Sequence, residues 1–123
     1  MLKKFKLTIA EIVTLEQELH HLLTEDSISF GIKYDITKII EKTEAITKRF
    51  NTSKYDIIKK YGSKVEGQDD VFTLEGSEHY AKAIEELNNL ANKTEVLNSE
   101  LNLVDFKDMK SKYAYRVVYK LLS

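Results

Sequence analysis

The chain has 123 residues, of which 42% are hydrophobic and 32% are charged, and its formal net charge at pH 7 is −1. These values are typical of one globular domain with a well-solvated surface, and they exclude an intrinsically disordered chain. The absence of cysteine excludes disulfides, thiol catalysis and thiolate metal sites. No apolar stretch approaches the roughly 20 residues of a membrane span, and no signal-peptide pattern is complete, so we expect a soluble intracellular protein without a membrane partner.

The small net charge conceals three blocks of different sign. Residues 1–62 carry 11 basic and 9 acidic side chains, residues 63–104 carry 3 and 9, and residues 105–123 carry 5 and 2. The acidic middle block argues against a continuous nucleic-acid-binding surface. It suits either a basic surface on a partner or a fold in which the basic last block packs near the acidic middle.

The first elements are indicated by alternation and by a capping pattern. Residues 2–8 alternate in part between apolar and polar side chains, which predicts a short strand. Thr8 followed by Glu11 forms a capping box, so a helix is expected to begin after Thr8 and to end around residues 24–26. The apolar positions of this helix recur at steps of three and four: Ile12, Leu15, Leu19 and Leu22.

Residues 30–62 predict one long amphipathic helix of roughly 45–50 Å. Ser27 or Ser29 is expected to cap its start, and Gly62 to end it in the left-handed conformation. The short connection before it predicts a helical hairpin with the first helix. The first helix is about half as long, so the far part of the long helix needs another partner. The apolar stripe consists of Ile32, Ile36, Ile39, Ile46, Phe50 and Ile57.

The second half of the chain predicts shorter elements. Residues 64–65 and 71–74 flank an acidic loop and predict a β-hairpin, with an irregular acidic loop anchored by its apolar residues as the alternative. Ser77 is expected to cap a helix through Ala91 that places Tyr80, Ile84 and Leu87 on its core face. Residues 95–104 alternate with a period of two, which predicts a strand, and a terminal helix is expected to start at residue 105 or 108.

Together these patterns predict a mainly helical α+β fold, as a single domain over residues 1–123. The expected helical hairpin of residues 9–61 packs against one small antiparallel sheet. That sheet is formed by residues 2–7, 64–74 and 95–103. Helices 77–92 and 106–122 complete the core. The chain contains neither an internal repeat nor a linker between two domains.

No pattern in the chain is specific for catalysis or for a cofactor. His20 and His21 are adjacent and would point about 100° apart on a helix, so they cannot share one ion. His79 stands alone near two glutamates. The chain lacks a nucleophile elbow, a recognisable triad, a phosphate-binding glycine-rich loop and a dinucleotide fingerprint. We therefore expect a protein that is not an enzyme and that has no catalytic, metal-binding or cofactor-binding residues.

Two groups of residues are candidates for contact with a partner. The first is acidic, and the second interleaves aromatic and basic side chains near the end of the chain. For the second group, internal packing, a protein interface and nucleic-acid contact are all compatible with the pattern, with nucleic acid the least favoured. The isoleucine-rich long helix also leaves self-association as an alternative. The interface candidates are Glu66, Asp69, Asp70, Glu75, Tyr113, Tyr115, Arg116 and Tyr119.

Three short motifs carry a resemblance to a known family. They are Lys60-Tyr61-Gly62, the acidic insertion of residues 66–70, and the segment from Leu90 to Leu97. In this layout the chain resembles an uncharacterised family of small proteins encoded by tailed bacteriophages. That family has a strand, a helical hairpin ending in Lys-Tyr-Gly, an acidic insertion and a helix–strand–helix. The chain departs from it at residues 27–29, where a proline is expected.

The resemblance implies a non-enzymatic bacteriophage protein that acts through protein–protein contact, most simply as a small virion or assembly component. Its partners would be virion proteins or a host protein, with a homo-oligomer as an alternative, and it would reside in the bacterial host cytoplasm, in the virion or in both. A second hypothesis is an inhibitor or modulator of a host protein, for example a defence protein, that acts through the acidic residues 66–78. A third is a nucleic-acid-binding accessory that uses residues 107–120.

Overall fold

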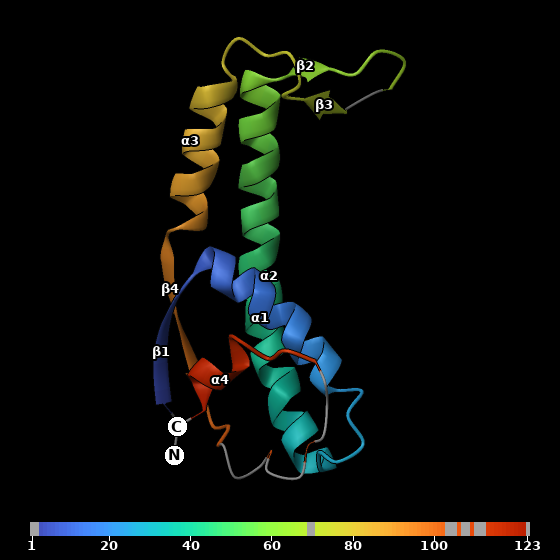
Figure 1. The fold of residues 1–123 in the computed structure, drawn as a ribbon, viewed down its shortest axis with the longest axis vertical. Coiled ribbons are helices and arrows are strands. Elements are labelled where there is room, and N and C mark those ends of the chain that lie inside the picture. The colour runs from blue at the N-terminus through green and yellow to red at the C-terminus, as the bar shows by residue number, and fades with distance from the viewer. Residues whose placement is uncertain (1–2, 69–70, 103–105, 107–108, 110–112, 123) are drawn as a thin grey trace.

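The long helix α2 (Phe30–Tyr61) is the axis beside which the other elements lie (Figure 1). The computed structural model describes residues 3–68, 71–102, 106, 109 and 113–122. The 32 residues of α2 span about 48 Å, which confirms the predicted helix. Ser29 caps it, because its Oγ accepts a hydrogen bond from the Ile32 N–H at 3.2 Å. Its buried stripe consists of Ile36, Ile39, Ile40, Thr43 and Ile46.

Strand β1 (Lys3–Thr8) leads directly into helix α1 (Ile9–Leu22). The predicted capping box is confirmed: Thr8 Oγ1 accepts from the Glu11 N–H at 3.1 Å, and the Thr8 N–H donates to Glu11 Oε1 at 3.0 Å. The apolar stripe of α1 is fully buried, and α1 crosses α2 obliquely in Figure 1. The predicted helical hairpin is therefore present, with α1 ending slightly earlier than expected.

The strands form two separate sheets, so the prediction of one sheet is wrong. Strand β4 (Thr94–Ser99) pairs antiparallel with β1, with Phe5 opposite Leu97. Strands β2 (Ser63–Lys64) and β3 (Phe72–Thr73) form the predicted hairpin at the far end of α2 (Figure 1). The two sheets cannot merge, because the length of α2 separates its far end from the β1–β4 pair. Strand β4 also ends at Ser99 rather than at residue 103.

Helix α3 (Tyr80–Ala91) packs beside the far half of α2 and supplies the partner which that half needs (Figure 1). The buried residue of α3 is Ala83, whereas Tyr80, expected on the core face, is exposed. Ser77 does not cap α3, contrary to the prediction, because His79 immediately precedes the helix. Instead, Ser77 Oγ donates to the Tyr61 carbonyl at 2.6 Å and accepts from the His79 N–H at 3.1 Å.

Gly62 ends α2 in an extended conformation, with φ −95° and ψ −177°, so the predicted left-handed cap is wrong. Glycine is required for a different reason. A Cβ at this position would lie 2.4 Å from the Thr73 carbonyl oxygen and 2.6 Å from the Ile58 carbonyl oxygen. The residue therefore lets the backbone of β3 approach the end of α2.

Replacing Gly62 with alanine is expected to lower the free energy of unfolding by about 1–3 kcal/mol, because two backbone carbonyls must move. Urea denaturation measures this change. Gly31→Ala is the matched control, because a Cβ there meets no atom closer than Ser29 Oγ at 3.9 Å. The control should be neutral or slightly stabilising. Equal stability of Gly62→Ala and the wild type would contradict the close approach.

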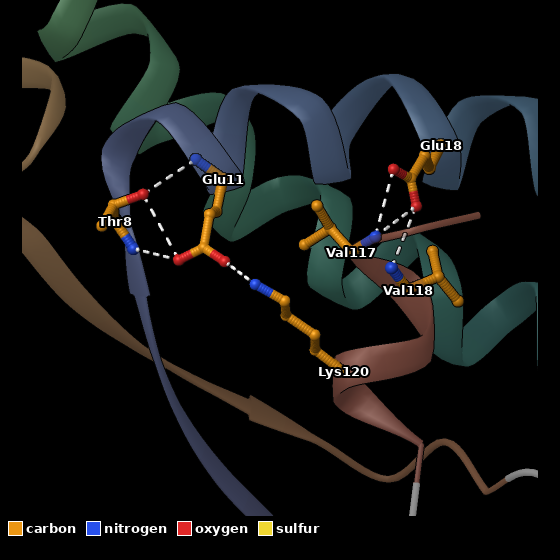
Figure 2. Close-up of polar contacts among 6 residues, drawn as sticks. All are labelled: Thr8, Glu11, Glu18, Val117, Val118 and Lys120. Atoms are coloured by element: carbon orange, nitrogen blue, oxygen red, sulfur yellow. Dashed lines mark hydrogen bonds and ion pairs between the residues drawn. The ribbon is translucent and has the colours of Figure 1, made fainter. Parts of the chain in front are cut away.

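The last described segment, residues 113–122, contains only the four-residue helix α4 (Val118–Leu121), so the predicted terminal helix over residues 106–122 is wrong. Figure 2 shows the reason. The carboxylate of Glu18, a side chain only 2% exposed, accepts hydrogen bonds from the N–H groups of Val117 and Val118, the shortest at 2.9 Å. A continuous helix would use those two N–H groups internally. The carboxylate of Glu18 accepts from them instead, because a carboxylate buried without hydrogen-bond partners would lower the stability of the fold.

Glu11 ties the start of α1 to α4, through an ion pair with Lys120 (Figure 2). The hydrogen bond from Lys120, followed by that from the Thr8 N–H, lowers the pKa of Glu11 below its ordinary value of 4.5. A carboxyl whose folded-state pKa is lowered contributes stability above its unfolded-state pKa. That contribution is lost as the pH falls through the folded-state value.

The stability difference between the wild type and Glu11→Gln should therefore be largest at neutral pH and should shrink as the pH falls below about 4.5. Urea denaturation over a pH series measures this difference. Glu41→Gln, at an exposed position on α2, is the control and should differ little from the wild type at any pH. A Glu11→Gln difference that does not change with pH would contradict the role of this ion pair.

Candidate protein-binding site

A groove follows α2 from its crossing with α1 toward the β2–β3 hairpin. It has a volume of about 550 Å³ and is referred to below as the α2 groove. Its lining side chains come from α1 and α2 and are mostly polar: Glu16, Glu44, Thr47, Lys48, Asn51, Thr52 and Tyr55.

The α2 groove is open because α3 covers only one side of the far half of α2 (Figure 1). Residues 51–56 are all exposed, although the preceding turns of the same helix form part of the core. The described chain therefore leaves these turns of α2 largely uncovered.

Two polar atoms in the α2 groove lack a hydrogen-bond partner within the described part of the chain. They are Oε1 of Glu16 and Oγ1 of Thr47, and both are inaccessible to solvent. A buried polar atom without a partner costs about 1–3 kcal/mol. These two atoms are buried within the chain, whereas the carboxylate of Glu44 is exposed in the same groove and would favour a basic donor from another molecule.

Tyr55 joins the α2 groove to the β2–β3 hairpin. Its ring lies edge-to-face against Phe72 of β3, with ring centroids 6.1 Å apart, and Lys59 Nζ lies 5.8 Å from the centroid of the same Phe72 ring. Tyr55 and Val71 are each 40% exposed. The exposed ring of Tyr55 and the partly buried ring of Phe72 form an apolar patch that we call the hairpin surface. The α2 groove and the hairpin surface are continuous through Tyr55.

Where the structure describes them, the acidic interface candidates lie in and just after the β2–β3 hairpin. Glu66 is exposed in the loop between β2 and β3. Glu75 is exposed just after β3, and its N–H donates to Thr73 Oγ1 at 3.1 Å. Asp69 and Asp70 lie outside the described residues.

The aromatic interface candidates lie near α1 and α4, away from the hairpin (Figure 1). Tyr115 is only 2% exposed, so its assignment to an interface is wrong. Its hydroxyl lies 2.6 Å from His21 Nδ1 and donates to Glu25 Oε1 at 2.7 Å. Tyr113 stacks on His21 with ring centroids 3.9 Å apart, while Arg116 and Tyr119 are exposed. The structure thus assigns Tyr115 to the core and leaves Arg116 and Tyr119 on the surface.

Sequence patterns missed both the α2 groove and an aromatic pair at the start of α2. Phe30 is 87% exposed and Tyr34 is 65% exposed, with Lys33 and Lys38 near their rings. Their i, i+4 spacing outside the buried stripe could have indicated an exposed pair. The groove residues give no such signal, because threonine, asparagine and lysine on a helix face are typical of ordinary solvated surface.

Within the described residues, no three His, Cys, Asp or Glu side chains are placed to hold a metal ion. No helix in the described chain is both long and apolar enough to cross a membrane. Comparison of the chain with protein-family models, curated proteins and solved structures finds no match in any of the three.

Proposed function

We propose that this chain is a non-enzymatic bacteriophage protein that acts through protein–protein contact, as a small virion or assembly component. The bacteriophage assignment rests on the resemblance in the sequence. The contact function rests on one observation: an open groove of about 550 Å³ is continuous, through Tyr55, with the partly exposed aromatic area of the hairpin surface. We place the contact site at the α2 groove and the hairpin surface.

The chemistry of the two parts defines the partner that fits. In the α2 groove, the exposed carboxylate of Glu44 is an acceptor for a basic donor, which a partner arginine or lysine side chain supplies. On the hairpin surface, Tyr55 and Phe72 offer aromatic area of the kind that dominates interface energetics. A protein segment with a basic residue next to an apolar one matches both parts.

Mass spectrometry of purified virions tests this function. The copy number of the chain is measured against the major capsid protein, and a fixed ratio consistent with a symmetric ring supports the proposal. Absence of the chain from virions contradicts the virion role.

Tyr55→Ala should reduce incorporation into virions by roughly tenfold, because it removes the aromatic area that joins the groove to the hairpin surface. The same quantitative mass spectrometry measures the loss. Tyr34→Ala is the matched control, an exposed tyrosine on the same helix outside the contact site, and it should be incorporated like the wild type. Equal losses for the two variants would contradict the placement of the site.

A second candidate function is inhibition or modulation of a host protein. It is favoured by the exposed carboxylates of Glu66, in the loop of the β2–β3 hairpin, and Glu75, just after β3, which add to Glu16 and Glu44 in the groove. Such a protein would be absent from virions. It would form a one-to-one complex with a host protein during infection, and Tyr55→Ala would weaken that complex.

A further inference from the structure

Strand β1 has a free edge. Within the described chain, β1 pairs only with β4. The other edge of this two-stranded sheet is different, because β4 runs near α2. There Asn98 and Glu100 share a cavity of about 150 Å³ with Lys38 and Lys42. Among the residues that the structure describes, the β1 edge has no second strand beside it.

The phase of the β1–β4 hydrogen bonds shows which backbone groups point outward. In an antiparallel pair, every second opposed pair exchanges both backbone hydrogen bonds. The Ile9 N–H donates to the Lys93 carbonyl at 2.8 Å. Continuing this register in steps of two, the backbone groups of Phe5 bond β4, whereas the backbone groups of Lys4 and Lys6 point away from β4. Thr8 agrees with this alternation, because its N–H donates to Glu11 Oε1 and not to a carbonyl of β4.

The N–H and C=O groups of Lys4 and Lys6 therefore have no partner in the β1–β4 ladder. Both residues are exposed, and neither makes a further hydrogen bond within the described chain. Four backbone groups are thus available at the edge, bounded on one side by the capping box at Thr8.

Side chains define the chemistry of this edge. Lys4 and Lys6 lie on the outer face of the sheet, where Val96 of β4, opposite Lys6, is 59% exposed. Phe5, between the two lysines, points to the inner face and is only partly buried against the core. An added strand would therefore meet positive charge at two positions that flank an apolar one.

Lysine on an edge strand also prevents copies of one protein from pairing with each other. A second copy of β1 placed antiparallel would bring lysines opposite lysines, which is destabilising. The same charge favours a strand of opposite sign, so the edge discriminates against self-pairing and in favour of an acidic strand.

We propose that the β1 edge binds, by strand addition, an extended protein segment in which acidic side chains alternate with apolar ones. The backbone of that segment bonds Lys4 and Lys6. Its acidic residues lie opposite the two lysines, and the apolar residue between them contacts Phe5. The inference rests on the proposed function in assigning the chain a protein partner, but it uses a different surface from the α2 groove.

The test uses a capped peptide of roughly ten residues that alternates glutamate and valine. Binding is followed by fluorescence anisotropy, and hydrogen exchange of single amides is followed by NMR. The peptide should bind, and it should slow exchange at the amides of Lys4 and Lys6. The Thr8 amide, already bonded to Glu11, is the internal reference and should change little. A matched peptide of lysine and valine should not bind.

Two variants separate the backbone from the charges. Lys6→Pro removes an outward N–H without removing a β1–β4 bond, a placement that edge strands tolerate. It should weaken binding by at least roughly tenfold. The double variant Lys4→Gln/Lys6→Gln retains the backbone groups, so it remains informative if the proline variant fails to fold. It should weaken binding by about three- to tenfold and reduce its dependence on salt.

Several results would overturn the inference: no binding of the glutamate–valine peptide, equal binding of the lysine–valine peptide, or slowed exchange confined to other amides. Dimerisation of the protein that protects the same amides without any peptide would also overturn it, as would binding of an oligonucleotide at this edge in preference to the peptide. None of these results changes the loss that is expected for Tyr55→Ala in virions. Failure of the strand-addition inference is therefore distinguishable from failure of the proposed function.

Discussion

Replacement of Glu18 by alanine is expected to lower the free energy of unfolding by about 2–5 kcal/mol. The carboxylate is buried and accepts hydrogen bonds from the N–H groups of Val117 and Val118 (Figure 2). Without it, two buried donors lose their partner, at about 1–3 kcal/mol each. The segment that carries α4 should then detach from α1.

Urea denaturation measures the loss, and NMR spectra of α4 residues show whether the segment detaches. Glu18→Gln retains one carbonyl acceptor and should lose less stability than Glu18→Ala. Gln17→Ala, at the adjacent exposed position of α1, is the control and should change stability by less than about 0.5 kcal/mol. If Glu18→Ala were as stable as this control, Glu18 would not anchor the end of the chain.

Replacement of Tyr115 by alanine should be similarly severe, at about 3–5 kcal/mol, because it removes a buried aromatic ring. Tyr115→Phe keeps the ring and loses the hydroxyl bonds to His21 and Glu25. It should therefore cost about 1–2 kcal/mol.

Thermal and urea denaturation measure both effects. The control is Tyr119→Ala, a second tyrosine of the same segment whose side chain is exposed, and it should change stability by less than about 0.5 kcal/mol. Equal effects of Tyr115→Ala and Tyr119→Ala would contradict the assignment of Tyr115 to the core.

The first half of the fold was predictable because its signals are local. The capping box of Thr8 and Glu11, the cap at Ser29 and the stripe of α2 each depend on residues a few positions apart. Helix ends and periodic faces of this kind are specified by the segment itself. The mainly helical α+β class followed from them and is confirmed.

The end of the chain was not predictable, because a contact distant in sequence decides its structure. Residues 106–122 have the periodicity of a helix, but Glu18 takes the N–H groups of Val117 and Val118 from across the core. The sequence does not distinguish a buried glutamate on α1 from a solvated one. Gly62 illustrates the same limit, since the close approach of Thr73 that requires glycine depends on the tertiary structure.

The candidate site was only partly predictable for a related reason. Glu66 and Glu75 were identified by their charge; both are exposed, Glu66 in the loop of the β2–β3 hairpin and Glu75 just after β3. The α2 groove depends on where α1 crosses α2 and on which side α3 covers, and neither fact is encoded by the groove residues. Tyr115 was wrongly assigned because an aromatic residue among lysines has the same pattern in a core and in an interface.

The central claim is that the α2 groove and the hairpin surface bind another protein, and site-specific photo-crosslinking tests it most directly. A photoreactive phenylalanine analogue replaces Tyr55 in one variant and the exposed Lys82 of α3 in another, and both are expressed in infected cells. We expect irradiation to join the chain to one virion or host protein from position 55 and not from position 82. No crosslink at position 55, or the same crosslinks from both positions, would contradict the account.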